Sequence, residues 1–210
     1  MARVLKTTDR VSQFAEKNLK NKKEFGEDAR LAFKRHLNDL KRSEKSDPAF
    51  PYIFVPEKAE DIIELANKLT IAEGEGDQEF TCAGFQEFIL GSLFGWVHKE
   101  TGKRRFTDSY AQVARQQGKS VLNAILGIKC SNFDNYNYGQ IYCTATKSDQ
   151  ARIVLNEISK FINADADLQE LFDIKDYKSE ITGKITNTVI RALGRDTKSI
   201  DGFRPYLGIV

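Results

Sequence analysis

The chain has 210 residues, of which 40% are hydrophobic and 30% charged, so it can bury one substantial α/β core with a helical appendage. Its 32 Lys and Arg residues nearly balance its 30 Asp and Glu residues, which excludes a wholly basic surface and confines any DNA contact to a local patch. No run of about 18 apolar residues is present, so no membrane contact is expected.

The first 47 residues are rich in charged side chains and poor in strand formers. Apolar residues at helical spacing predict an amphipathic helix over residues 27–43, and Asp47-Pro48 then breaks it. One interpretation is a solvated helix lying across the core domain. The other is a surface for a partner protein or DNA, carried by its basic side chains Lys34, Arg35, Lys41 and Arg42.

Two further helices are predicted before the centre of the chain, over residues 57–69 and 84–96. The basic run 102–105 reads as a turn entering the first core strand, and residues 107–113 as that strand. The basic residues of the turn could face phosphates, although a solvated hairpin edge is the more common arrangement.

Cysteines and histidines give no metal-site pattern. Cys82, Cys130 and Cys143 are scattered and show no paired spacing, so we expect buried reduced thiols. His36 and His98 lack cysteines or carboxylate clusters at ligand spacing, and both are expected at the surface.

The chain is organised around Gly118-Lys119-Ser120, which precedes a helix predicted over residues 119–128. A helix start offers free backbone N–H groups and the positive end of the helix dipole to a phosphate. Gly118 would let the backbone approach phosphate, Lys119 would reach the β and γ oxygens, and the Ser120 hydroxyl would ligate magnesium.

A surface turn that caps a helix is the alternative interpretation of so short a motif. The usual phosphate-loop pattern also has a first glycine, and Val113 occupies that position here. The predicted strand before the motif and the helix after it favour the phosphate loop. Within the loop, Arg115 could compensate the charge of a phosphoryl-transfer transition state, or it could pair with a structural carboxylate.

After the loop the sequence predicts a strand at 140–144 and a helix opened by a capping box at Thr146. Strand and helix in this order indicate a parallel sheet, with residues 144–146 at the ligand-binding carboxyl end of a strand. Residues 178–182 and 184–193 read as two strands of an antiparallel hairpin or edge addition. Residues 206–210 read as a buried core strand.

The loop Val113–Ser120, with arginine three residues before the glycine, resembles the variant phosphate loop of the large terminase subunits of tailed bacteriophages. These proteins are ATPases that pump viral DNA into a preformed capsid. The resemblance covers residues 50–210 in order, and its motifs are 83–90, 93–96, 102–106, 144–146, 150–151, 192–193, 201–203 and 205–210.

The resemblance implies a fold of the P-loop NTPase type: a mostly parallel sheet flanked by helices, with an N-terminal helical extension. It implies catalytic roles for Lys119 and Arg115, magnesium ligation by Ser120 and adenine recognition by Gln86, whose amide carries both donor and acceptor. A solvent-facing glutamine is the alternative for Gln86. The implied nucleotide-binding residues are Gln86, Ala114, Arg115, Gln116, Gln117, Gly118, Lys119 and Ser120.

Arg195 and Arg204 flank a polar loop, and in ring-forming ATPases an arginine of one subunit often completes its neighbour's site. Arg195 ranks above Arg204 as such a donor in trans, and an ordinary surface loop is the alternative.

In the family, the strand corresponding to 206–210 ends in an Asp-Glu pair that orients magnesium and activates water. The sequence stops at Val210. We therefore expect residues 1–47 to be a charged helical extension and residues 48–210 to be a P-loop ATPase domain truncated before that pair. This fragment is expected to bind nucleotide weakly and to hydrolyse it poorly.

The function implied is the ATPase portion of a DNA-packaging motor that uses ATP and Mg²⁺ in the cytoplasm of the infected bacterial host. The implied partners are double-stranded DNA, the small terminase subunit, the portal protein and further copies of the chain in a ring. The alternatives are a non-catalytic interaction module with a P-loop fold and another helicase-like DNA translocase.

Overall fold

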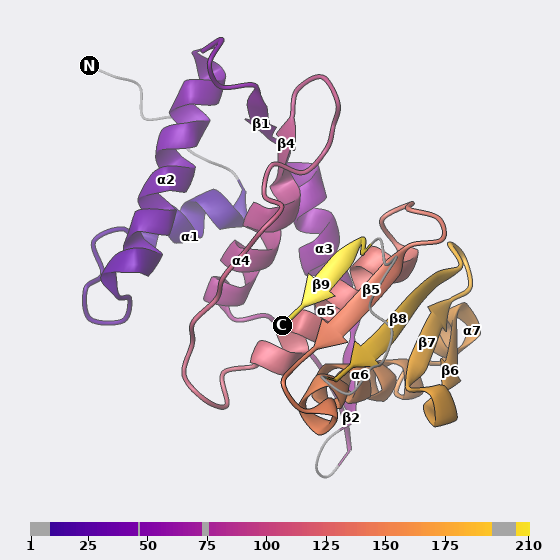
Figure 1. Cartoon of the computed structure of the whole chain (residues 1–210). Helices are drawn as coiled ribbons and strands as arrows, with labels where there is room; N and C mark the ends of the chain where they lie inside the picture. The colour runs from indigo at the N-terminus through magenta and orange to yellow at the C-terminus, as the bar shows by residue number, and fades with distance from the viewer. Residues whose placement is uncertain (1–8, 46, 73–75, 195–204) are drawn as a thin grey trace. The chain divides into compact units, whose positions relative to one another are not determined.

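The computed structural model describes residues 9–45, 47–72, 76–194 and 205–210 (Figure 1). The chain divides into two compact units, Met1–Asn67 with Thr81–Ala111 and Lys68–Phe80 with Gln112–Val210.

The first unit consists of four helices and one two-stranded antiparallel sheet. Its elements are α1 (Arg10–Asn18), α2 (Glu27–Glu44), β1 (Tyr52–Phe54), α3 (Pro56–Lys68), α4 (Gly84–Gly95) and β4 (Trp96–His98). The strands pair so that Phe54 lies opposite Trp96. The helices predicted over 27–43, 57–69 and 84–96 are confirmed to within a residue or two.

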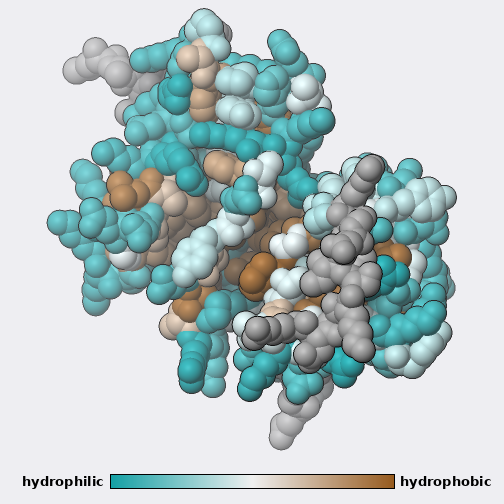
Figure 2. All heavy atoms as spheres, viewed as in Figure 1, coloured by the Kyte–Doolittle hydropathy of each residue, from teal (hydrophilic) through white to brown (hydrophobic). Residues whose placement is uncertain are grey.

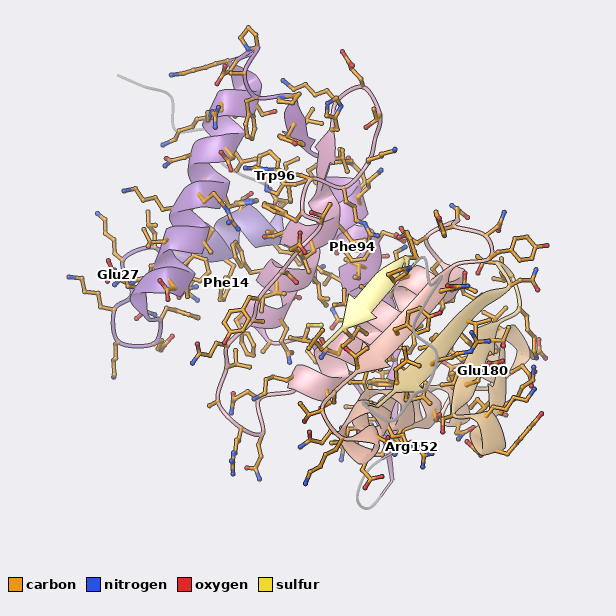
Figure 3. The ribbon with its side chains drawn as sticks, viewed as in Figure 1. Phe14, Glu27, Phe94, Trp96, Arg152 and Glu180 are labelled. Atoms are coloured by element: carbon orange, nitrogen blue, oxygen red, sulfur yellow. The ribbon has the colours of Figure 1, made fainter. Side chains whose placement is uncertain are left out.

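Aromatic side chains from three segments of the first unit form its core. Phe33 contacts Phe14, Phe25 and Phe88 edge to face, with ring centroids 4.8 to 5.6 Å apart. Figure 3 shows Phe14 and Trp96 among the side chains of this unit. Since Phe14 and Phe33 lie on α1 and α2, the charged N-terminal helices are an integral part of this core.

The basic run 102–105 does not enter a core strand. Residues 103–105 run back beside β4, where His98 N donates to Lys103 O and Arg105 N donates to Trp96 O. The Arg105 guanidinium lies 2.7 Å from Asp39 Oδ2 and 5.4 Å from the Trp96 ring centroid. Arg105 therefore faces neither bulk solvent nor a phosphate, but packs inside the first unit.

The strand predicted over residues 107–113 is wrong. These residues form no strand, and 107–112 are exposed. The segment is short in β-branched residues and contains Asp108 and Ser109, which favour turns over pleated sheet. No described strand pairs with it, so no ladder compensates for this weak propensity.

The second unit is built on a five-stranded mixed sheet with helices packed against it. Before the sheet comes a small antiparallel pair, β2 (Thr70–Ala72) with β3 (Asp77–Glu79). The other elements are α5 (Lys119–Asn132), β5 (Gln140–Thr144), α6 (Ser148–Asn163), α7 (Ala166–Leu171), β6 (Phe172–Lys175), a 3₁₀ turn (Asp176–Lys178), β7 (Glu180–Gly183), β8 (Thr188–Leu193) and β9 (Leu207–Ile209).

The strand order is β6-β7-β8-β5-β9. β5 runs parallel to both β8 and β9, whereas β6, β7 and β8 pair antiparallel. Helices α5 and α6 pack against each other and against β5 and β8. The predicted hairpin is confirmed as β7 and β8, and its second strand, β8, pairs with β5. The described sheet is therefore mixed and not mostly parallel.

Two details of this sheet differ from the sequence prediction. Residues 184–187 form the turn of the hairpin, so β8 begins only at Thr188. The predicted core strand 206–210 contributes only β9, which pairs with β5 alone among the described residues. Of its three residues only Ile209 is buried.

Apolar side chains fill the space between sheet and helices in the second unit. Ile141, Ile190 and Ile181 from three neighbouring strands are 0% exposed, as are Ile125 and Ile158 from α5 and α6. The buried face of α6 was predicted from its helical spacing. This core holds α5 and α6 together and packs both against β8.

Within the described parts of the chain, no helix is both long enough and apolar enough to cross a lipid bilayer.

Candidate nucleotide-binding loop

Two residues of the loop before α5 adopt the left-handed backbone conformation. Gln116 and Gly118 have positive φ values of 61° and 73°, and α5 begins directly afterwards at Lys119. Left-handed residues that alternate with right-handed ones turn successive N–H groups into one concavity. The left-handed conformation at the helix cap is adopted freely by Gly118 and would strain most other residues.

The N-terminus of α5 is open. No side chain caps it, and its first turn contains no acidic residue. The first bond of the helix runs from Leu122 N to Gly118 O at 2.9 Å, so the N–H groups before Leu122 have no acceptor within the helix. These groups and the positive end of the helix dipole are available to an anion.

Lys119 folds back over the loop. Its ammonium donates to Val113 O at 2.9 Å and to Ala114 O at 2.8 Å, and the side chain is exposed. These two hydrogen bonds keep the Lys119 ammonium next to residues 113 and 114 of the loop. No side-chain signal marks these acceptors, because both are backbone atoms, and sequence reasoning missed this contact.

The other loop residues precede Lys119 in the sequence, and Ser120 follows it. Arg115, Gln116 and Gln117 are exposed, and Ser120 is half-buried in the first turn of α5. No described carboxylate forms an ion pair with Arg115. Residues 114–117 and Lys119 of the predicted phosphate loop are exposed, and Gly118 and Ser120 are half-buried.

Gln86 lies in the other compact unit, in the first turn of α4, and is 5% exposed. Its Oε1 accepts from Ala83 N at 2.9 Å, the half of a capping box that glutamine supplies at the third helical position. Gln86 is therefore not the solvent-facing glutamine that was its alternative. The same oxygen and the amide nitrogen keep further hydrogen-bonding capacity.

The capping box predicted at Thr146 does not form. Helix α6 is capped by Lys147 without a side-chain bond, and Thr146 Oγ1 instead lies 3.3 Å from Gln150 Oε1. Thr144 Oγ1 donates to Ile209 O at 3.3 Å and ties the carboxyl end of β5 to β9.

Arg195 and Arg204, the two candidate donors in trans, lie outside the described residues.

The remaining reactive groups offer no competing site. All three cysteines are buried and none forms a disulfide, as predicted, and burial raises the pKa of Cys82 and of Cys143 to about 12. Such thiols stay protonated and are poor nucleophiles. Across the described residues, no three His, Cys, Asp or Glu side chains cluster in a way that could hold a metal ion.

The profile of the family described as terminase large subunit, ATPase domain, matches residues 84–210, more than half of the chain. The chain belongs to this terminase family. The matched region begins at α4 and ends after β9, so it includes Gln86 and the whole candidate loop.

A search of solved structures finds the crystal structure of the large terminase of bacteriophage HK97, with a TM-score of 0.62 and 24% sequence identity. The match covers 72% of this chain and 30% of the HK97 chain, so this terminase chain spans less than a third of that protein. At this identity the likeness shows a shared fold. A search of curated proteins gives no match.

Proposed function

We propose that the chain is the nucleotide-binding part of a viral DNA-packaging ATPase. The observation that carries the proposal is the uncapped N-terminus of α5 behind a loop with two left-handed residues, in a region that matches the terminase ATPase family. The loop and the first turn of α5 carry Arg115 and Lys119 close in sequence to the free N–H groups of the helix start. That combination suits the β and γ phosphates of a nucleoside triphosphate.

In this proposal Lys119 exchanges the carbonyls of Val113 and Ala114 for phosphate oxygens. Ser120 ligates Mg²⁺ through its hydroxyl, and Arg115 offsets charge on the transferred phosphoryl group. Residues 114–118 supply backbone donors. Gln86 reads adenine through its amide, which makes ATP the preferred triphosphate.

Membership of the family supports ATP hydrolysis as the general activity, coupled in the complete protein to translocation of double-stranded DNA into a procapsid in the host cytoplasm. The proposed partners are DNA, the small subunit, the portal protein and a ring of identical copies. We further propose that residues 48–210 carry the ATPase domain and residues 1–47 an N-terminal extension that packs on α4. The test measures nucleotide binding.

The test is the thermal shift produced by Mg-ATP in the parent, in Lys119→Ala and in Lys178→Ala. Lys178 is a matched control because it is an exposed lysine in the 3₁₀ turn between β6 and β7, at the far edge of the sheet from β9. Nucleotide at about 100 times its Kd should raise the Tm of the parent and of Lys178→Ala by about 5 °C or more. Lys119→Ala should show little or no shift.

Equal shifts in all three proteins would contradict the role of Lys119. The absence of any shift would instead favour the non-catalytic interaction module. Omission of magnesium should reduce the shift of the parent, since Ser120 then lacks the ion that it is proposed to ligate.

A further inference from the structure

The exposed side of α2 carries an excess of positive charge. Between Leu31 and Lys45 its exposed charged residues are Lys34, Arg35, Lys41, Arg42, Glu44 and Lys45, five cations and one anion. The other acidic residue of this stretch, Asp39, is buried and paired with Arg105. Glu27 and Asp28 at the start of α2 are also exposed, so the excess of positive charge is confined to the C-terminal part of the helix and its cap, in a chain with a formal charge of +2.

Three of these cations form a row. Lys34 and Lys41 lie on α2, and Lys45 is its C-cap residue. Spacings of seven and four residues place the three on one side of the helix and its cap, over about 16 Å at 1.5 Å per residue. No described acidic residue forms an ion pair with any of the three. We call Lys34, Lys41 and Lys45 the lysine row.

The two arginines beside the lysine row are held by the rest of the first unit. The Arg35 guanidinium lies 4.8 Å from the Phe106 ring centroid. Arg42 lies 4.3 Å from the Phe50 ring centroid and bonds Asp47 at 3.1 Å. The arginines therefore have a structural role, whereas the lysine row has none that the described contacts reveal.

The surface suits a nucleic acid better than a protein. Protein interfaces depend on buried aromatic and apolar anchors and are depleted in lysine. The large apolar side chain that α2 exposes is Leu31, at 51%. In Figure 2 the region of α2 is predominantly hydrophilic, and Figure 3 shows nitrogen-tipped side chains of this helix pointing away from α1. Flexible ammonium groups along one side of a helix can each contact a phosphodiester.

We propose that the lysine row of α2 binds the phosphate backbone of double-stranded DNA without reading its sequence. The choice of duplex DNA rests on the proposed function, but the contact itself needs no nucleotide. Each lysine neutralises a phosphate and releases counterions, so binding is weak, sequence-independent and strongly dependent on salt.

The experiment measures fluorescence anisotropy of a labelled DNA duplex of random sequence, titrated with the full chain in the absence of nucleotide. The test variant is Lys34→Gln, Lys41→Gln, Lys45→Gln, and glutamine preserves helix propensity. The control is Lys68→Gln, Lys99→Gln, Lys178→Gln, which removes three exposed lysines from other elements and lowers the net charge by the same amount. Circular dichroism verifies that both variants fold.

At low salt the test variant should bind at least about tenfold more weakly than the parent, and the control within about twofold of it. The slope of log K against log salt should fall by about 2 to 3 in the test variant alone, at roughly 0.9 per lost phosphate contact. Equal losses in both variants, or no binding by the parent, would overturn the proposal.

Binding of polyglutamate in place of DNA through the same lysines would also overturn it, in favour of an acidic protein partner. The Mg-ATP thermal shift of the test variant should equal that of the parent. A failure of DNA binding is thereby distinguished from a failure of the nucleotide site.

Discussion

The imidazole of His36 lies buried in the first unit, 3% exposed, and not at the surface as its sequence context predicted. Trp96 Nε1 donates to Nδ1 at 3.0 Å, so the proton of the neutral ring lies on Nε2, which is 2.9 Å from Ser12 Oγ. Burial lowers the pKa of His36 to about 4. The ring is therefore neutral in the folded protein at physiological pH, and its protonation would break the bond from Trp96.

This residue makes the first unit sensitive to acid. Between pH 6.5 and about 4 the unfolded chain binds a proton at His36 that the folded chain does not, so the free energy of unfolding falls as the pH falls through this window. The loss at pH 5 relative to pH 7 should be about 2 kcal/mol. Urea titrations followed by fluorescence of Trp96, the only tryptophan, measure it in this unit.

His36→Gln serves as the control, because glutamine can accept from Trp96 but does not titrate. Its free energy of unfolding should change less between pH 7 and pH 5 than that of the parent. Identical pH dependence in the two proteins would show that another group is responsible.

At the scale of elements, α4 illustrates how closely the helices of the first unit approach. A Cβ atom added at Gly91 would lie 2.4 Å from Val11 Cγ2 on α1 and 3.2 Å from Ile63 Cδ1 on α3. Val11 is β-branched and cannot swing aside easily. The next residue, Ser92, has a buried hydroxyl without a hydrogen-bond partner among the described residues.

These neighbouring positions should respond oppositely to alanine. Gly91→Ala gains up to about 1 kcal/mol of helix propensity, but the overlap with Val11 outweighs this gain and should lower the free energy of unfolding by about 1 to 3 kcal/mol. Ser92→Ala removes an unsatisfied hydroxyl and should raise it by up to about 1 kcal/mol. Urea unfolding at neutral pH, again with Trp96 as probe, measures both, and a Gly91→Ala protein as stable as Ser92→Ala would contradict the packing argument.

The elements best predicted from sequence are those whose pattern of apolar residues matches the face that they bury in the fold. The bounds of β5 and the start of α5 were predicted correctly, because an apolar run or helical stripe follows a clear turn signal in each. The strand predicted at 107–113 does not form, and β9 is shorter than the strand predicted at 206–210. Alternation of apolar and polar residues alone does not make a strand, because a strand also needs neighbouring strands to pair with. β6 was missed because Phe172–Lys175 has only four residues, two of them charged.

Candidate site residues show the same division. The motif predicted which residues form the loop, and Gly118 has the positive φ that favours glycine. The sequence could not indicate that Lys119 bonds two carbonyls or that Gln86 completes a helix start. Both contacts join a side chain to backbone atoms that the local fold brings near it. No pattern of residue types in the sequence indicates such contacts.

At the scale of the whole molecule, the proposed roles in ATP binding differ between residues: adenine recognition for Gln86 and phosphate contact for Lys119. The family match includes both residues.

Gln86→Glu separates these contributions. Glutamate retains an oxygen for Ala83 N and suits a helix start, so the Tm without ligand should stay unchanged. The amide donor to adenine is lost, and the thermal shift with Mg-ATP should fall to that with Mg-tripolyphosphate. In the parent the ATP shift should exceed the tripolyphosphate shift, and persistence of that difference in Gln86→Glu would refute adenine recognition by this residue.

The close approach at Gly91 also bears on how this protein can vary. Since Val11 occupies the space that a side chain at position 91 would need, a larger residue on α4 is tolerated only together with a smaller one on α1. Positions 11 and 91 should therefore change as a pair in related chains. The N-terminal segment would then be inherited with the family region that begins at residue 84, although it lies outside that match.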